Sequence, residues 1–129
     1  MARTALITGA SSGLGAEYAR QLAARRTDLV VVARDKAALT ELAGALRARY
    51  RVEVEVLVAD LLVPRQLERV VHRLTDPDRP IDMLVNNAGF GLPLSFARND
   101  IGDEVRHLQL LVEVPMRLTH AVLTPMLQR

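Results

Sequence analysis

A glycine-rich segment near the N-terminus contains the residues best suited to bind an anion. It spans residues 8–15, Thr-Gly-Ala-Ser-Ser-Gly-Leu-Gly, between the apolar run of residues 5–7 and a helical pattern. Glycine lets the backbone turn sharply out of a strand and approach a bulky group closely. The helix that follows would point free N–H groups and the positive end of its dipole at the same place. The segment therefore predicts a site for the pyrophosphate of a dinucleotide.

Short apolar runs alternate with helical patterns along the whole chain, and these elements must position that segment. We predict strands over residues 4–8, 29–33, 51–59 and 81–85. Helices are expected over residues 13–26 and 36–49, from residue 64 to a turn at 76–80, and over 103–127, where Pro115 should kink or divide the last helix. This alternation implies right-handed βαβ units. We expect an α/β fold with a parallel sheet of four strands in the order 3-2-1-4 and helices on both faces.

The composition is typical of one globular domain over residues 1–129, since 50% of the residues are apolar and 25% are charged. No apolar run reaches the roughly 20 residues of a membrane span, and no signal-peptide pattern opens the chain. We therefore expect a cytoplasmic protein that does not bind membranes. The three histidines lack metal-ligand spacing, so no metal site is expected. Aromatic residues are scarce and the arginines are interleaved with apolar residues, which disfavours nucleic-acid binding.

Two further polar segments strengthen the interpretation of the glycine-rich segment. Asn-Asn-Ala-Gly at residues 86–89 follows the fourth predicted strand, and Asp60-Leu61 follows the third. With the spacing Gly-x-x-x-Gly-x-Gly from Gly9, these segments resemble the short-chain dehydrogenase/reductase family. The resemblance extends over the whole chain, which corresponds to about the first half of a typical member. It implies a Rossmann-like domain, incomplete on its C-terminal side, from an oxidoreductase that transfers hydride between a nicotinamide and a carbonyl or alcohol.

The resemblance also implies a role for each motif residue. Gly9 would allow the tight turn, Gly13 the close approach to the pyrophosphate, and Gly15 the packing of helix on sheet. Asn87 would brace the central strands. The cofactor would be lined by the remaining motif residues: Ser11, Ser12 and Leu14 along the phosphates, Asp60 and Leu61 at the adenine, and Asn86, Ala88 and Gly89 beside the adenosine and ribose.

The residue at the end of the second predicted strand indicates which dinucleotide is bound. Members that use NAD tend to carry an acid there, whereas this chain has Arg34. A guanidinium can donate two parallel, charge-assisted hydrogen bonds to a 2′-phosphate. We therefore expect NADP in preference to NAD. The alternative interpretation is a solvated arginine at a helix entrance.

The catalytic pair that usually accompanies such a site is missing from these residues. The resemblance implies a tyrosine followed four residues later by a lysine, but the chain has one lysine, Lys36, and neither Tyr18 nor Tyr50 has that spacing. Leu111 also stands where the family often has an asparagine. We therefore expect no catalytic residue in the chain. Two hypotheses follow: a cofactor-binding fragment of an NADP-dependent oxidoreductase acting on a small molecule, or a non-catalytic dinucleotide-binding module or oligomer subunit.

The last predicted helix is apolar on several sides. Leu108, Leu110, Leu111, Val112 and Val114 all fall on it. Burial under the sheet and contact with a second copy of the chain remain two open interpretations of this pattern. An unpaired fourth strand would also expose an apolar edge, so we expect self-association or marginal stability of the chain alone.

Overall fold

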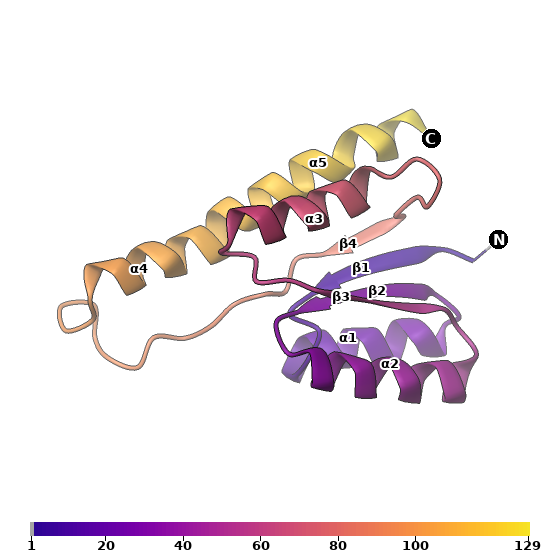
Figure 1. Cartoon of the computed structure of the whole chain (residues 1–129), viewed down its shortest axis with the longest axis horizontal. Helices are drawn as coiled ribbons and strands as arrows, with labels where there is room; N and C mark the ends of the chain where they lie inside the picture. The colour runs from indigo at the N-terminus through magenta and orange to yellow at the C-terminus, as the bar shows by residue number, and fades with distance from the viewer. Residues whose placement is uncertain (1) are drawn as a thin grey trace.

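A computed structural model describes residues 2–129 as a four-stranded parallel sheet with helices on both faces (Figure 1). The strands are β1 (Thr4–Thr8), β2 (Asp28–Ala33), β3 (Val54–Val58) and β4 (Met83–Val85). The helices are α1 (Gly13–Ala24), α2 (Lys36–Tyr50), α3 (Pro64–Thr75), α4 (Ile101–Leu108) and α5 (Val114–Gln128), with the π-helix η1 (Gln109–Glu113) joining the last two.

The strand order is β3-β2-β1-β4, which confirms the predicted order. Leu6 pairs with Val30 of β2 on one side and with Leu84 of β4 on the other. The order in which the chain adds strands to the sheet therefore reverses between β3 and β4: β2 and β3 lie on one side of β1, and β4 lies on the other. The carboxyl ends of β1 and β4 meet beside this switch point, where open α/β sheets bind ligands.

Two cores lie on opposite faces of the sheet, because side chains alternate along each strand. Ala5 and Ile7 of β1 face α1 and α2, and Leu6 faces α3 and α5. Figure 1 shows these helix pairs as separate layers, with α1 and α2 on one side and α3 and α5 on the other. Strands covered on both faces explain the continuous apolar run of β2.

Two strands are shorter than the sequence predicts. The strand predicted over residues 81–85 contains β4 at Met83–Val85 only. The Asp82 carboxylate accepts the Thr4 N–H at 2.9 Å, so a side chain replaces a backbone carbonyl at this point. The strand predicted over residues 51–59 is observed as β3 at Val54–Val58, because Arg51 still caps α2.

Pro115 divides the last helix, as predicted, but through a π-helical turn. The Val114 N–H donates to the Gln109 carbonyl, five residues earlier. A regular turn would press the Pro115 ring against the Leu111 carbonyl, and the wider turn relieves that clash. Pro125 also lies inside α5, which the sequence analysis did not anticipate. Figure 1 shows α4 extending past the sheet, and none of its residues is buried.

Candidate functional site

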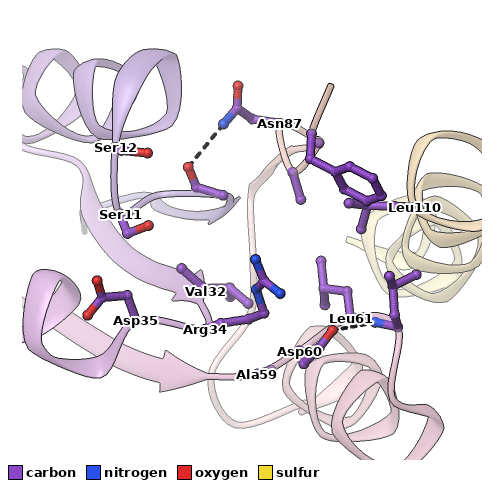
Figure 2. Close-up of a pocket in the computed structure, with 16 residues that line it drawn as sticks. Ser11, Ser12, Val32, Arg34, Asp35, Ala59, Asp60, Leu61, Asn87 and Leu110 are labelled. Carbon is purple, nitrogen blue, oxygen red and sulfur yellow. Dashed lines mark hydrogen bonds between the residues drawn. The ribbon is translucent and has the colours of Figure 1, made fainter. Parts of the chain in front are cut away.

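A cleft of about 560 Å³ lies at the carboxyl ends of the strands (Figure 2). This volume falls within the range of small-molecule sites, roughly 300–1,000 Å³. Loops after all four strands contribute to its walls, together with Leu110 of η1. The lining residues are Gly9, Ser11, Ser12, Val32, Ala33, Arg34, Asp35, Ala59, Asp60, Leu61, Leu62, Asn87, Ala88, Gly89, Phe90 and Leu110.

The glycine-rich segment forms the turn from β1 into α1. Gly9 and Gly13 have φ of 63° and 55°, in the left-handed region that side chains rarely adopt. Ser12 is the N-cap of α1, and its side chain makes no capping hydrogen bond. No acidic residue occupies the first turn of α1. The hydroxyls of Ser11 and Ser12 and the end of the helix dipole therefore present a favourable environment for an anion.

Two glycines allow backbones to approach more closely than side chains permit. A Cβ on Gly9 would lie 2.9 Å from the Ala88 Cα. A Cβ on Gly15 would overlap the Gly9 carbonyl oxygen and lie 2.5 Å from Asn87 Nδ2. Gly15 therefore lets α1 pack directly against the turn that precedes it.

Hydrogen bonds from Thr8 and Asn87 hold the ends of β1 and β4 together. The buried Thr8 hydroxyl accepts the N–H groups of Asn87 and Ala88, both at 3.0 Å, and donates to the Val85 carbonyl at 3.4 Å. The Asn87 side-chain amide donates to the carbonyls of Thr8 and Gly9, at 3.2 and 3.1 Å. Asn87 thus braces the central strands. No role was predicted for Thr8, although a threonine at a strand end beside a predicted ligand loop is a signal that could have indicated one.

Arg34 and Asp35 follow β2 directly at one wall of the cleft. The Asp35 carboxylate accepts the Ala38 N–H at 3.0 Å and so caps α2. Arg34 is exposed and extends into the cleft in Figure 2. Within residues 2–129, no hydrogen bond or ion pair engages its guanidinium. The cleft therefore contains one cation whose donors remain available.

The segment after β3 forms the opposite wall. One oxygen of the Asp60 carboxylate accepts the Leu62 N–H at 3.0 Å, and the Asp60 N–H donates to the Gln66 side chain at 2.6 Å. These bonds fix the carboxylate while leaving its second oxygen available. Leu61 is buried next to it and lines the cleft.

Eight of the twelve residues proposed from the sequence line the cleft. They are Gly9, Ser11, Ser12, Arg34, Asp60, Leu61, Ala88 and Gly89. Gly13 and Gly15 lie in the first turn of α1, outside the lining. The Leu14 side chain is 73% exposed, and the Asn86 side chain donates to Thr119 of α5 at 3.1 Å. Phe90 and Leu110 line the cleft but were not proposed, because no local motif indicates apolar residues that reach a site through a long loop.

None of the residues needed for proton transfer in a tyrosine–lysine pair lines the cleft. Tyr18, Lys36 and Tyr50 all lie on α1 and α2. A Cβ on Gly89 would lie 3.2 Å from Leu111 Cδ2, so an apolar side chain occupies the space beside the cleft there. Among residues 2–129, no group of three or more His, Cys, Asp or Glu could hold a metal ion. None of the helices described is long and apolar enough to cross a membrane.

Comparison with known proteins establishes the family. The model of the short chain dehydrogenase family matches residues 3–129. The chain belongs to the short-chain dehydrogenase family, and the resemblance seen in its motifs is confirmed.

Solved structures of longer proteins share this fold. A short-chain dehydrogenase from Sphingobium yanoikuyae, solved with NADPH, is 44% identical with a TM-score of 0.94, over 98% of this chain and 49% of that one. A ketone-specific alcohol dehydrogenase from Comamonas testosteroni is 42% identical with a TM-score of 0.94, over 98% and 50%. A relative found by sequence, sulfoacetaldehyde reductase 2 of Chromohalobacter salexigens, is 34% identical over 99% of this chain and 50% of its own length. The chain therefore spans about half the length of these relatives.

Proposed function

We propose that this chain binds NADP in the cleft and forms the cofactor-binding part of an oxidoreductase that transfers hydride between a nicotinamide and a carbonyl or alcohol. The observation that carries the proposal is Arg34, an unengaged guanidinium extending into the cleft directly after β2. A 2′-phosphate is the group of NADP that NAD lacks. A guanidinium can bind it through two parallel hydrogen bonds.

The remaining walls fit the same ligand. Gly13 has a left-handed φ, and a Cβ there would meet no atom within 4 Å, so the backbone is open to a ligand at this point. Ser11 and Ser12 would donate to the phosphates beside the N-terminus of α1. The second oxygen of Asp60 would accept from the adenine amino group, with Leu61 against the ring. In the oxidoreductase, the bound group would supply or accept the hydride.

Some relatives support the preference for NADP. The solved structure from Sphingobium yanoikuyae contains NADPH, as does an L-sorbose reductase from Gluconobacter frateurii that is 30% identical with a TM-score of 0.89. The Comamonas testosteroni enzyme is described as ketone-specific, and the Gluconobacter frateurii enzyme is named as a reductase of the sugar L-sorbose. We extend from them only the reaction class, a carbonyl reduction or its reverse.

The test is a calorimetric titration of the chain and of Arg34→Asp with NADP. Loss of a bidentate, charge-assisted contact should weaken NADP binding by about 10- to 100-fold. NAD binding should change much less. Arg98→Asp is the matched control, because it makes the same charge change at an exposed loop position outside the cleft. An equal loss of NADP binding in both variants would refute a specific contact at Arg34.

A second candidate function is a dinucleotide-binding module without chemistry of its own. The favouring observation is that Lys36 and both tyrosines lie on α1 and α2, away from the cleft lining, while Leu111 fills the space beside Gly89. We therefore propose that the chain alone is catalytically incomplete. Oxidation of NADPH with a panel of aldehydes and ketones tests this directly, and turnover of any of them by the chain alone would contradict it.

We also propose that the last helix takes part in self-association. Exposed apolar side chains recur along α4, η1 and α5, among them Ile101, Leu108, Val112, Met116 and Leu123. Large exposed apolar patches mark interaction sites, which supports a partner surface along these helices. Sedimentation velocity should show a species larger than the 14.2 kDa chain. A single species of monomer mass across micromolar concentrations would contradict it.

A further inference from the structure

A second hollow lies at the carboxyl ends of α1 and α2, away from the cleft. It measures about 330 Å³ and is lined by Ala23, Ala24, Arg26, Arg49, Tyr50 and Arg51. Figure 1 shows α1 and α2 lying side by side along the same face of the sheet. The 12 residues of α1 separate this hollow from the glycine-rich turn by roughly 18 Å. The two sites are therefore distinct.

The charged side chains that line this hollow are all positive. Three of its six lining residues are arginines, and none is acidic. Within residues 2–129, no ion pair involves Arg26, Arg49 or Arg51, and the Arg49 guanidinium lies 5.3 Å from the Tyr50 ring centroid. Elsewhere the chain pairs arginines closely, as where Arg73 meets Glu55 at 3.1 Å. The arginines of the hollow keep their donors available.

The backbone at two of these arginines is strained. Arg26 and Arg51 have φ of 62° and 56°, and they are the only residues other than glycine with positive φ in the described part of the chain. Each follows a helix end: the Arg26 N–H donates to the Ala23 carbonyl at 2.9 Å and the Arg51 N–H to the Arg47 carbonyl at 3.0 Å. Glycine is the residue favoured at such positions. Both strained positions carry arginine and both line one hollow.

The negative ends of the helix dipoles do not explain why arginine stands at the two left-handed positions, 26 and 51. Cations near a helix C-terminus are stabilising, but they act from the last turn as well. Arg47 and Arg49 occupy the last turn of α2, and Arg25 caps α1 with φ of −93°. These residues supply the positive charge without left-handed strain. An arginine at a left-handed position, where glycine would stand without strain, is an outlier that points to function.

We propose that this hollow binds the phosphate group of a small molecule. Guanidinium groups match phosphate oxygens through paired hydrogen bonds, and Arg26 and Arg51 would approach the anion from two different helix ends. A hollow of this volume, lined by two alanines and an aromatic ring besides the arginines, suits a compact ligand better than an extended polymer. The site is independent of the proposed NADP site, so either can fail without the other.

The test uses amide chemical shifts of the chain titrated with inorganic phosphate in a phosphate-free buffer. Phosphate should shift amides of residues 23–27 and 49–52 in addition to any shifts of residues 9–15. The double variant Arg26→Gly/Arg51→Gly should lose the first set, with at least tenfold weaker binding there, and keep the second. Its melting temperature without phosphate should rise by a few degrees, because glycine relieves the left-handed strain.

The control Arg65→Gln/Arg98→Gln removes the same two charges from exposed positions outside both sites. It should retain the phosphate shifts at residues 23–27 and 49–52. The proposal is overturned if phosphate leaves these amides unshifted, if the double glycine variant binds as tightly as the parent, or if the control loses binding equally. Binding of duplex DNA or of vesicles containing phosphatidylserine through these arginines, without binding of phosphate, would also overturn it.

Discussion

Replacing Gly15 by alanine tests the close packing that shapes the glycine-rich turn. The added Cβ would overlap the Gly9 carbonyl oxygen and lie 2.5 Å from Asn87 Nδ2. Both neighbours are held, because the Asn87 amide donates to the carbonyls of Thr8 and Gly9. A normal contact of about 3.5 Å requires the helix or the turn to move by about 1 Å.

The magnitude follows from two opposing effects. Overpacking against rigid neighbours costs about 1–3 kcal/mol, and here the neighbours are backbone and a bonded amide, so the upper half applies. Alanine in a helix returns about 1 kcal/mol relative to glycine. The net destabilisation of Gly15→Ala is therefore about 1–2 kcal/mol. NADP binding should weaken as well, since the turn that we propose to face the phosphates shifts.

Gly44 provides a matched control in the same layer. It lies inside α2, and a Cβ there would meet no atom within 4 Å. Gly44→Ala should stabilise the chain by about 0.5–1 kcal/mol. Urea denaturation, followed by circular dichroism, should separate the two variants by about 1–2 M in midpoint. Equal or greater stability of Gly15→Ala would refute the packing argument.

Two further stability predictions follow from hydrogen bonds and charges. Thr8→Val leaves the Asn87 and Ala88 N–H groups without their buried acceptor, so it should lower the free energy of unfolding by about 3 kcal/mol in urea denaturation. Thr75→Val, at an exposed position, should lower it by less than about 1 kcal/mol. Equal losses in the two variants would contradict this prediction. The Asp78 N–H and the Arg79 side chain hold the pKa of Asp76 below its ordinary 3.8, so its stabilising contribution is present above pH 3.8 and is lost as the pH falls through the lower folded value. Asp76→Asn should therefore flatten the pH dependence of the melting temperature only below about pH 4, and an unchanged profile there would contradict it.

The fold was predictable because its signals are local and mutually consistent. Apolar runs and helical periods fall in alternation, and the handedness of βαβ connections then restricts the strand order. Departures occur where a single residue changes backbone bonding. Asp82 substitutes its carboxylate for a ladder acceptor and shortens β4, while Pro115 is accommodated by a π-turn that the sequence pattern does not specify.

The candidate site also contains residues that local motifs predict and residues that they do not. Residues in short motifs at strand ends, such as Gly9 and Asp60, could be assigned because strand ends converge at one edge of the sheet. Phe90 and Leu110 could not be assigned in this way. Phe90 reaches the cleft from the loop after β4, and Leu110 reaches it from η1. The contact of Asn86 with Thr119 joins residues 33 positions apart, and no local pattern encodes such a contact. The left-handed backbone at Arg26 depends on where α1 ends, and helix propensity does not predict a helix end to within one residue.

The central claim is that the cleft recognises NADP through its 2′-phosphate. The most direct measurement is calorimetric titration of the unmodified chain with NADP and NAD under identical salt conditions. We predict that NADP binds at least tenfold more tightly, as expected for one charge-assisted, bidentate contact from Arg34. Equal affinities, or tighter binding of NAD, would contradict the account.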